Sequence, residues 1–217
     1  TQLGINVPSI IGGYAGNAVS AGADGSVIAG GGSAVYGANI ISGTNVGWST
    51  IGGGTGNQIT ENADHSAIST GEYNQIGGDA YDSAIGSGFH NQISGNADLS
   101  AIGSGVSNLI SGDAYRSTIG SGYQNQISGT ASDSVIGSGG NNRISGNAAA
   151  SAIGGGESNR IDGIADHSSI GGGVSNQISG NAWSGAIGSG SVNQIGGNAH
   201  HSAIGSGESN QINGNAY

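Results

Sequence analysis

The chain of 217 residues contains no cysteine, no methionine and no lysine, and its single proline is Pro8. Without cysteine it can form neither a disulfide nor a thiolate metal site. No apolar run approaches the length of about 18 residues that a membrane-spanning helix needs, so we expect no direct insertion into a membrane. The sequence starts at Thr1 without a signal peptide, and we expect it to be a processed or excised piece of a longer protein.

Charged and aromatic residues are also scarce. Charged residues make up 7% of the chain, against about 25% in ordinary globular domains. The formal net charge is −10, and the only basic residues are Arg116, Arg143 and Arg160. Such a chain cannot neutralise a phosphate backbone, which excludes nucleic acid as a partner. Glycine is abundant instead, and the 48 glycines exclude long helices.

An internal repeat of 17 residues organises nearly the whole sequence. Its consensus is S-A-I-G-S-G-x-x-N-Q-I-S-G-N-A-x-x, and the third and eleventh positions are Ile in all ten regular units. The sixth position is always Gly, the ninth always Asn and the fifteenth always Ala. The units begin at Ser49, Ser66, Ser83, Ser100, Ser117, Ser134, Ser151, Ser168, Gly185 and Ser202.

Two less regular units precede these ten, and the second of them has a six-residue insertion. We therefore predict a lead-in over residues 1–8 and one repeat domain over residues 9–217. Within that domain we expect irregular coils over 9–48 and regular coils over 49–217.

The spacing of the two Ile columns predicts the shape of each unit. The columns are eight residues apart within a unit and nine apart across its boundary, so each unit is nearly halved. We expect two short strands per unit, S-A-I-G-S and N-Q-I-S-G, joined by turns in which Gly and Asn adopt positive φ. The sequence thus predicts an all-β parallel β-solenoid, or β-roll, of about twelve coils that stack ~4.8 Å apart.

Strand residues alternate between faces, which predicts what lies inside the coil. In the unit that starts at Ser83, we expect Ile85 to point inward with Ser83 and Ser87, and Ile93 to point inward with Asn91 and Gly95. The invariant Asn column is expected to stack as a ladder of side-chain amides.

The two outward faces are expected to differ. The first strand presents a bare stripe of residues such as Ala84, Gly86 and Gly88, whereas the second presents polar residues such as Gln92 and Ser94. We expect another chain to pack on the bare stripe, and we predict a symmetric oligomer, most simply a trimer.

The repeat also resembles a known family. The pattern S-x-I-G-G-G followed by N-x-I-x-G, seen at residues 49–54 and 151–156 and in similar form at 9–14, resembles the YadA-like head of trimeric autotransporter adhesins. The resemblance covers residues 9–217. It implies a left-handed parallel β-roll with three chains around one axis, displayed on a bacterial surface to bind host matrix or cells. The repeats of well-known family members are shorter, and their stalk and membrane anchor do not occur here.

Variable residues concentrate at the seventh, eighth, sixteenth and seventeenth positions, which are turn positions. Exposed aromatic and charged side chains on a rigid scaffold are common anchors of recognition. The alternative is that they are solvated turn residues or cover neighbouring coils. The candidate binding residues are Tyr73, Phe89, His90, Tyr115, Arg116, Tyr123, Trp183, His200 and His201.

No catalytic, metal or cofactor site is expected. His200 and His201 are adjacent, but no Asp, Glu or Cys partners recur at metal-ligand spacing. The many serines have no His and Asp placed to activate one of them. We therefore do not expect an enzyme.

Three functions fit these observations. The first is an extracellular, homotrimeric adhesin head or fibre segment on a bacterial outer membrane, with a matrix protein, a glycan or another cell-surface molecule as partner. The second is the structural shaft of a phage tail fibre or surface filament. The third is an ice-binding solenoid, which needs a flat and regular array of hydroxyl or amide groups.

Overall fold

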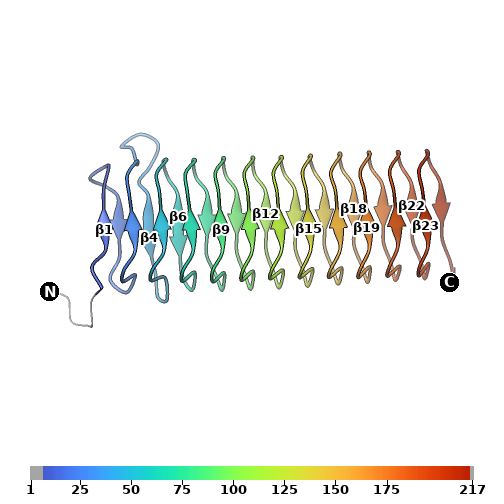
Figure 1. Ribbon diagram of the computed structural model, residues 1–217, viewed down its shortest axis with the longest axis horizontal. Coiled ribbons are helices and arrows are strands. Elements are labelled where there is room, and N and C mark those ends of the chain that lie inside the picture. The colour runs from blue at the N-terminus through green and yellow to red at the C-terminus, as the bar shows by residue number, and fades with distance from the viewer. Residues whose placement is uncertain (1–6, 216–217) are drawn as a thin grey trace.

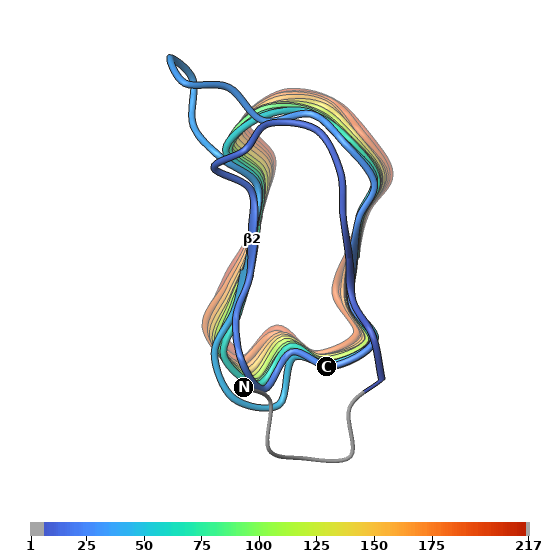
Figure 2. The ribbon, with the colours of Figure 1, turned by 90° about the vertical axis from the view of Figure 1, so that its left-hand side faces the viewer.

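The computed structural model describes residues 7–215, and over this range the chain winds into a parallel β-solenoid (Figure 1). Each coil contributes two short strands, one to each of two 12-stranded sheets. Figure 2 looks down the axis from the N-terminal end, and the receding chain passes counter-clockwise from β1 (Ile10–Ile11) over the upper turn to β2 (Ala18–Val19). The coil is therefore left-handed, the hand that the family resemblance implies. The fold class predicted from the repeat is confirmed.

The two sheets have the same construction, because every strand pairs in parallel with the strand one coil further on. The isoleucines lie in register, as Ile85 with Ile102 in one sheet and Ile93 with Ile110 in the other. Sheet A consists of β1, β3 (Val27–Ile28), β5 (Thr50–Ile51), β7 (Ala67–Ile68), β9 (Ala84–Ile85), β11 (Ala101–Ile102), β13 (Thr118–Ile119), β15 (Val135–Ile136), β17 (Ala152–Ile153), β19 (Ser169–Ile170), β21 (Ala186–Ile187) and β23 (Ala203–Ile204). Sheet B consists of β2, β4 (Ile40–Ser42), β6 (Gln58–Thr60), β8 (Gln75–Ile76), β10 (Gln92–Ile93), β12 (Leu109–Ile110), β14 (Gln126–Ile127), β16 (Arg143–Ile144), β18 (Arg160–Ile161), β20 (Gln177–Ile178), β22 (Gln194–Ile195) and β24 (Gln211–Ile212).

The apolar core is a thin column that runs along the rod between the two sheets. Ile102 of sheet A and Ile110 of sheet B are 0% exposed, and each such burial contributes roughly 1.5–3 kcal/mol. The alanine at the fifteenth position, such as Ala114, is also 0% exposed. The sequence shows this alanine column, but strand alternation alone does not place it in the core. The two Ile columns meet inside the coil as expected.

The invariant asparagines form a buried amide ladder, as predicted. Asn108 is 1% exposed, and its backbone N–H donates to the Oδ1 of Asn91 at 3.1 Å. Its Nδ2 donates to the same Oδ1 at 3.1 Å, to the carbonyl of Ser104 at 3.1 Å and to that of Gly122 at 3.0 Å. Each asparagine therefore joins its own coil to the coils before and after it, which explains why no other residue type occupies this column.

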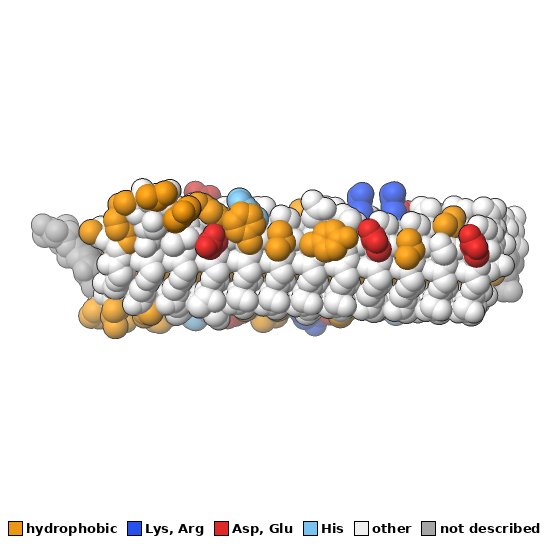
Figure 3. All heavy atoms as spheres, turned by 90° about the horizontal axis from the view of Figure 1, so that it is seen from above, with side chains coloured by type: hydrophobic (Ala, Val, Ile, Leu, Met, Phe, Trp, Pro, Cys, Tyr) orange, Lys and Arg blue, Asp and Glu red, His pale blue; other side chains and the backbone are white. Residues whose placement is uncertain are grey.

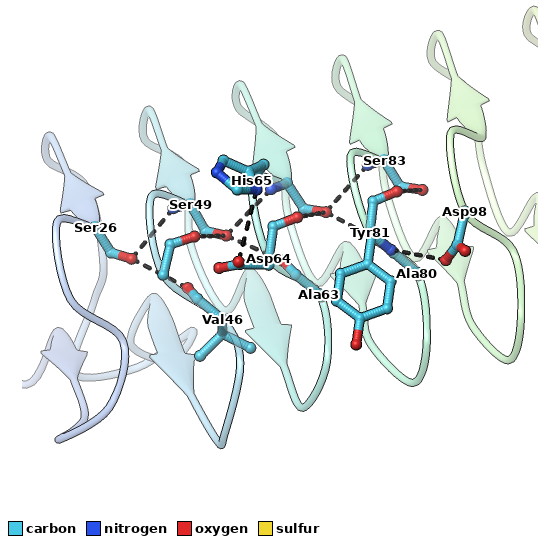
Figure 4. Close-up of polar contacts among 12 residues, drawn as sticks. Ser26, Val46, Ser49, Ala63, Asp64, His65, Ala80, Tyr81, Ser83 and Asp98 are labelled. Atoms are coloured by element: carbon cyan, nitrogen blue, oxygen red, sulfur yellow. Dashed lines mark hydrogen bonds and ion pairs between the residues drawn. The ribbon is translucent and has the colours of Figure 1, made fainter.

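The serines at the first position form a second buried ladder, which Figure 4 shows. The N–H of Ser49 donates to the Oγ of Ser26 at 3.2 Å, and the Oγ of Ser49 donates to the carbonyl of Ala63 at 3.0 Å. Gly185 occupies this position in one coil, so that coil supplies no hydroxyl to the next. The serine column is therefore interrupted, whereas the asparagine column is not.

In each complete regular coil, four residues have positive φ. In the coil that starts at Ser83 these are Gly88 (107°), His90 (56°), Gly95 (75°) and Leu99 (57°). The glycines agree with the predicted turns, but the two other residues do not. The N–H of each donates to a carbonyl of the preceding coil, at 3.0 Å for His90 and 2.8 Å for Leu99. These hydrogen bonds between coils hold the backbone of a non-glycine residue in the left-handed conformation, which costs ~1–2 kcal/mol in isolation.

The strands are shorter than predicted, and this changes which residues face inward. The expected five-residue strands are only two residues long in β9 and β10. The chain has already turned at Ser87, which is half-buried, and at Gly95, which is exposed. The predicted inward positions of Ser87 and Gly95 are therefore wrong, while those of Ser83 and Asn91 are confirmed.

Stacking within the chain also explains most of the bare stripe on sheet A. A Cβ on Gly86 would collide with the carbonyl oxygen of Gly103, and a Cβ on Gly88 would collide with that of Gly105. These glycines are needed for contact between coils, so they are not in themselves evidence of a second chain. Stacking does not explain the small side chains at the second position of the repeat, where Ala84 is exposed and points outward.

The six-residue insertion projects from the upper turn between β3 and β4 (Figure 2). Ser33 and Gly37 exchange backbone hydrogen bonds of 2.9 and 3.0 Å at its base, and the tip residues Val35 and Tyr36 are 80% and 60% exposed. In the part of the chain that the structure describes, no helix is long and apolar enough to cross a membrane.

Candidate functional site

The candidate residues lie on two opposite edges of the rod rather than in one site. The upper edge consists of the seventh and eighth positions of each unit, and the lower edge of the sixteenth and seventeenth (Figure 1). The candidates on the upper edge are Tyr73, Phe89, His90 and Tyr123. Those on the lower edge are Tyr115, Arg116, Trp183, His200 and His201. The edges themselves were correctly predicted from the sequence.

On the upper edge the structure brings three candidates into one aromatic cluster. The rings of Tyr73 and His90 stack with centroids 5.1 Å apart, and Phe89 meets His90 edge to face at 4.3 Å and Tyr73 at 5.9 Å. Tyr73 leans back over Gly56, where a Cβ would lie 2.7 Å from its ring. Phe89 remains 40% exposed, so the cluster presents an apolar surface beside the inserted loop. Hydrophobic side chains follow this edge along the rod in Figure 3.

Tyr123, the fourth candidate on the upper edge, partly covers the neighbouring coils. Its ring lies over Gly140, where any Cβ would collide with it, and its hydroxyl donates to the Oε1 of Glu157 at 3.4 Å. The side chain is still 46% exposed. Tyr123 therefore both covers the next coil, as the alternative interpretation holds, and offers a ring to solvent.

On the lower edge Arg116 is held by two neighbours. Its Nε lies 2.9 Å from the Oδ1 of Asp133, and its guanidinium carbon lies 4.7 Å from the centre of the Tyr115 ring. The nearby Asp133 carboxylate raises the pKa of Arg116 above its ordinary value. Arg116 is therefore already neutralised, and Tyr115 and Arg116 form a local contact rather than a free cationic site.

A second group on the lower edge combines tryptophan with histidine. Trp183 lies 5.1 Å from the ring of His200 and 4.1 Å from that of His201. A similar pair, Trp48 stacked on His65 at 5.4 Å, was missed because Trp48 belongs to an irregular coil. Within residues 7–215 no group of three or more His, Cys, Asp or Glu side chains could hold a metal ion.

The outer face of sheet B holds two neighbouring arginines that were not among the predicted site residues. Arg143 and Arg160 are paired in register on β16 and β18, and the Nε of Arg160 forms an ion pair with Asp162. Two basic side chains project next to each other in Figure 3. Both arginines occupy the tenth position, where Gln is the usual residue, so the sequence holds a signal for this pair.

The acidic residues lie elsewhere on the molecule. Every Asp and Glu other than Asp162 lies in an upper or a lower turn of its coil. Some of these carboxylates stabilise the stacking: the Oδ1 of Asp98 accepts the backbone N–H of Tyr81 at 3.0 Å (Figure 4). The negative charge of the rod is therefore concentrated on its edges, and the two arginines stand on a face between them.

The chain matches no protein-family model, and no curated protein matches it. The likeness to YadA-like heads therefore rests on the repeat pattern and on the left-handed β-solenoid. Taken together, the edges and the sheet B face offer surfaces for stacking, hydrogen bonding and charge pairing.

Proposed function

We propose that this chain is an extracellular, homotrimeric adhesin head or fibre segment, of the kind displayed on a bacterial outer membrane. In this role the solenoid is a rigid spacer, and the side chains of the upper and lower edges attach it to a cell surface, a matrix protein or a glycan.

The observation that supports a binding role is the separation of constant from variable positions. The inward columns of Ser, Ile, Asn, Ile and Ala scarcely change along the regular coils, while the edges change in every coil. The edges hold exposed aromatic side chains such as Phe89 and Trp183 in fixed backbone geometry. Rigid, partly exposed aromatic residues are typical anchors of protein recognition.

The proposed trimer is supported by a contrast between the two sheets. The second and tenth positions both precede a buried Ile and both point outward. The tenth carries long polar residues such as Gln92 and Arg143, whereas the second carries only Ala, Thr, Val, Ser or Ile. An outer face without a charged or long polar side chain suits close packing against a second copy.

The binding role can be tested with a triple variant of the upper cluster, Tyr73→Ser, Phe89→Ser and His90→Ser. Serine already occupies these turn positions at Ser191 and Ser209, so the fold is expected to persist. Binding of the full chain to immobilised matrix proteins, glycans and cells should fall about tenfold or more, as expected when aromatic anchors are removed. Val106→Ser with Val174→Ser, on the same edge, is the matched control. Equal binding by the triple variant, or no binding by the unaltered chain, would contradict the role of this cluster.

Two alternative functions each have a supporting observation. The uninterrupted Asn ladder favours a purely structural shaft, because it stiffens the rod without presenting anything to a partner. The Gln column on sheet B favours ice binding, because seven of the ten regular coils carry Gln at the tenth position and place it on the same outer face. Thermal hysteresis in solution of the purified chain would identify the second of these.

A further inference from the structure

We propose that Arg143 and Arg160 form a binding site on the outer face of sheet B for the acidic group of a glycan, a carboxylate or a sulfate ester. The proposal rests on the proposed attachment role, but it places a contact away from the turn edges, so the two can fail separately.

Arg143 and Arg160 lie side by side on the outer face of sheet B. Arg143 and Arg160 are direct partners in a parallel sheet, so their backbones are ~4.8 Å apart and both side chains leave the same face. Arg143 is exposed, and the Arg160 side chain is 48% exposed. Two guanidinium groups at this spacing can donate to different oxygens of a single oxyanion.

The positive charges of the two arginines are only partly balanced. Like charges directly opposite each other in a sheet are destabilising. Asp162 is the carboxylate that pairs with Arg160, and no ion pair to Arg143 forms among the described residues. The face therefore keeps one uncompensated positive charge in a molecule whose net charge is −10. An anionic ligand would relieve the repulsion that the fold leaves in place.

The surroundings of the two arginines favour a sugar over other anions. Gln126 lies in register before Arg143, and Gln177 lies in register after Arg160. These half-buried amides offer both hydrogen-bond donors and acceptors on the same sheet face as the two guanidinium groups. A glycan with acidic groups can use both, since its hydroxyls match the amides and its acid matches the arginines. A nucleic acid would meet the negative edges of the rod instead.

The test is isothermal titration of the full chain with three oligosaccharides of equal length: one sulfated, one containing uronic acid and one neutral. We expect at least one acidic oligosaccharide to bind and the neutral one to bind at least about tenfold more weakly. The double variant Arg143→Gln with Arg160→Gln restores the usual residue of the column, so its thermal melting should be unchanged or slightly improved. Its affinity for the acidic sugar should fall about tenfold or more.

Two further variants make the test specific. Gln58→Ala with Gln75→Ala changes two outward side chains of the same column away from the pair, where Ala18 already occupies the equivalent position, and should leave binding within about twofold. Asp162→Ser introduces the common residue of its position, frees Arg160 and should strengthen binding. The proposal is overturned if neither acidic oligosaccharide binds, if the double arginine variant binds as well as the unaltered chain, or if Gln58→Ala with Gln75→Ala weakens binding as much as the arginine variant does.

Discussion

The two sheets of this rod are nearly identical inside and different outside. Both place a fully buried Ile column against the core, as Ile102 and Ile110 illustrate, and both pair coil to coil in the same register. On the outside, sheet A carries short side chains without charge, whereas sheet B carries glutamines, two arginines and an aspartate. The interior columns therefore define the fold, whereas the outer positions can differ between the two faces without changing it.

The largest expected effect comes from giving sheet A the outer residue of sheet B. Ala84→Arg with Ala152→Arg places charge on the face that we propose packs in the trimer, and the solution mass should fall to that of one chain. Gln92→Arg with Gln177→Arg adds the same charge to sheet B and should leave the mass unchanged. Sedimentation of both variants measures this, and equal behaviour of the two would remove the distinction between the faces.

The next effect tests whether the interiors are equivalent. Ile102→Ala and Ile110→Ala each remove a fully buried side chain, and each should lower the free energy of unfolding by ~2–5 kcal/mol. Ile11 lies at the N-terminal end and is 50% exposed, so Ile11→Ala should lower the free energy of unfolding much less. Urea denaturation gives all three values. A large difference between Ile102→Ala and Ile110→Ala would show that the two interiors are not equivalent.

A smaller effect separates the two explanations for the glycines of sheet A. Gly120→Ala introduces a Cβ that collides with the carbonyl oxygen of Gly137, and it should destabilise the chain by ~1–3 kcal/mol. Ser128→Ala, at the outward position after the Ile of sheet B, should change stability by less than about 0.5 kcal/mol. If Gly120→Ala leaves thermal stability unchanged and alters only the oligomeric mass, glycine is required at this position for contact with a second chain and not for stacking of the coils.

The smallest effect concerns the column of buried serines at the first position, which precedes the strands of sheet A. Gly185→Ser restores the missing hydroxyl of the serine ladder, which can then accept the N–H of Ser202. This hydrogen bond should raise the free energy of unfolding by ~0.5–1.5 kcal/mol. Thermal melting of Gly185→Ser is compared with that of Ser151→Gly, which creates the same gap in another coil and should be destabilising. A lower melting temperature for Gly185→Ser would mean that the site is too tight for the side chain.

The sequence predicts the features that depend on its period and misses those that depend on contacts between coils. The spacing of Ile85 and Ile93 is sufficient to place two strands in each coil. Strand alternation does not show that Ala97 points inward, because it lies in a turn, nor that Leu99 adopts positive φ, because the reason is a hydrogen bond to the preceding coil. The column that holds Arg143 is visible in the sequence, but only the structure shows its uncompensated charge.

The most direct test of the account is the solution mass of the unaltered chain by sedimentation or light scattering. The chain has a mass of 20.7 kDa, and the proposed trimer predicts three times this value at concentrations where the charged sheet A variant gives a single chain. A mass of one chain for the unaltered protein would contradict the trimer and would leave the outer face of sheet A as a free surface.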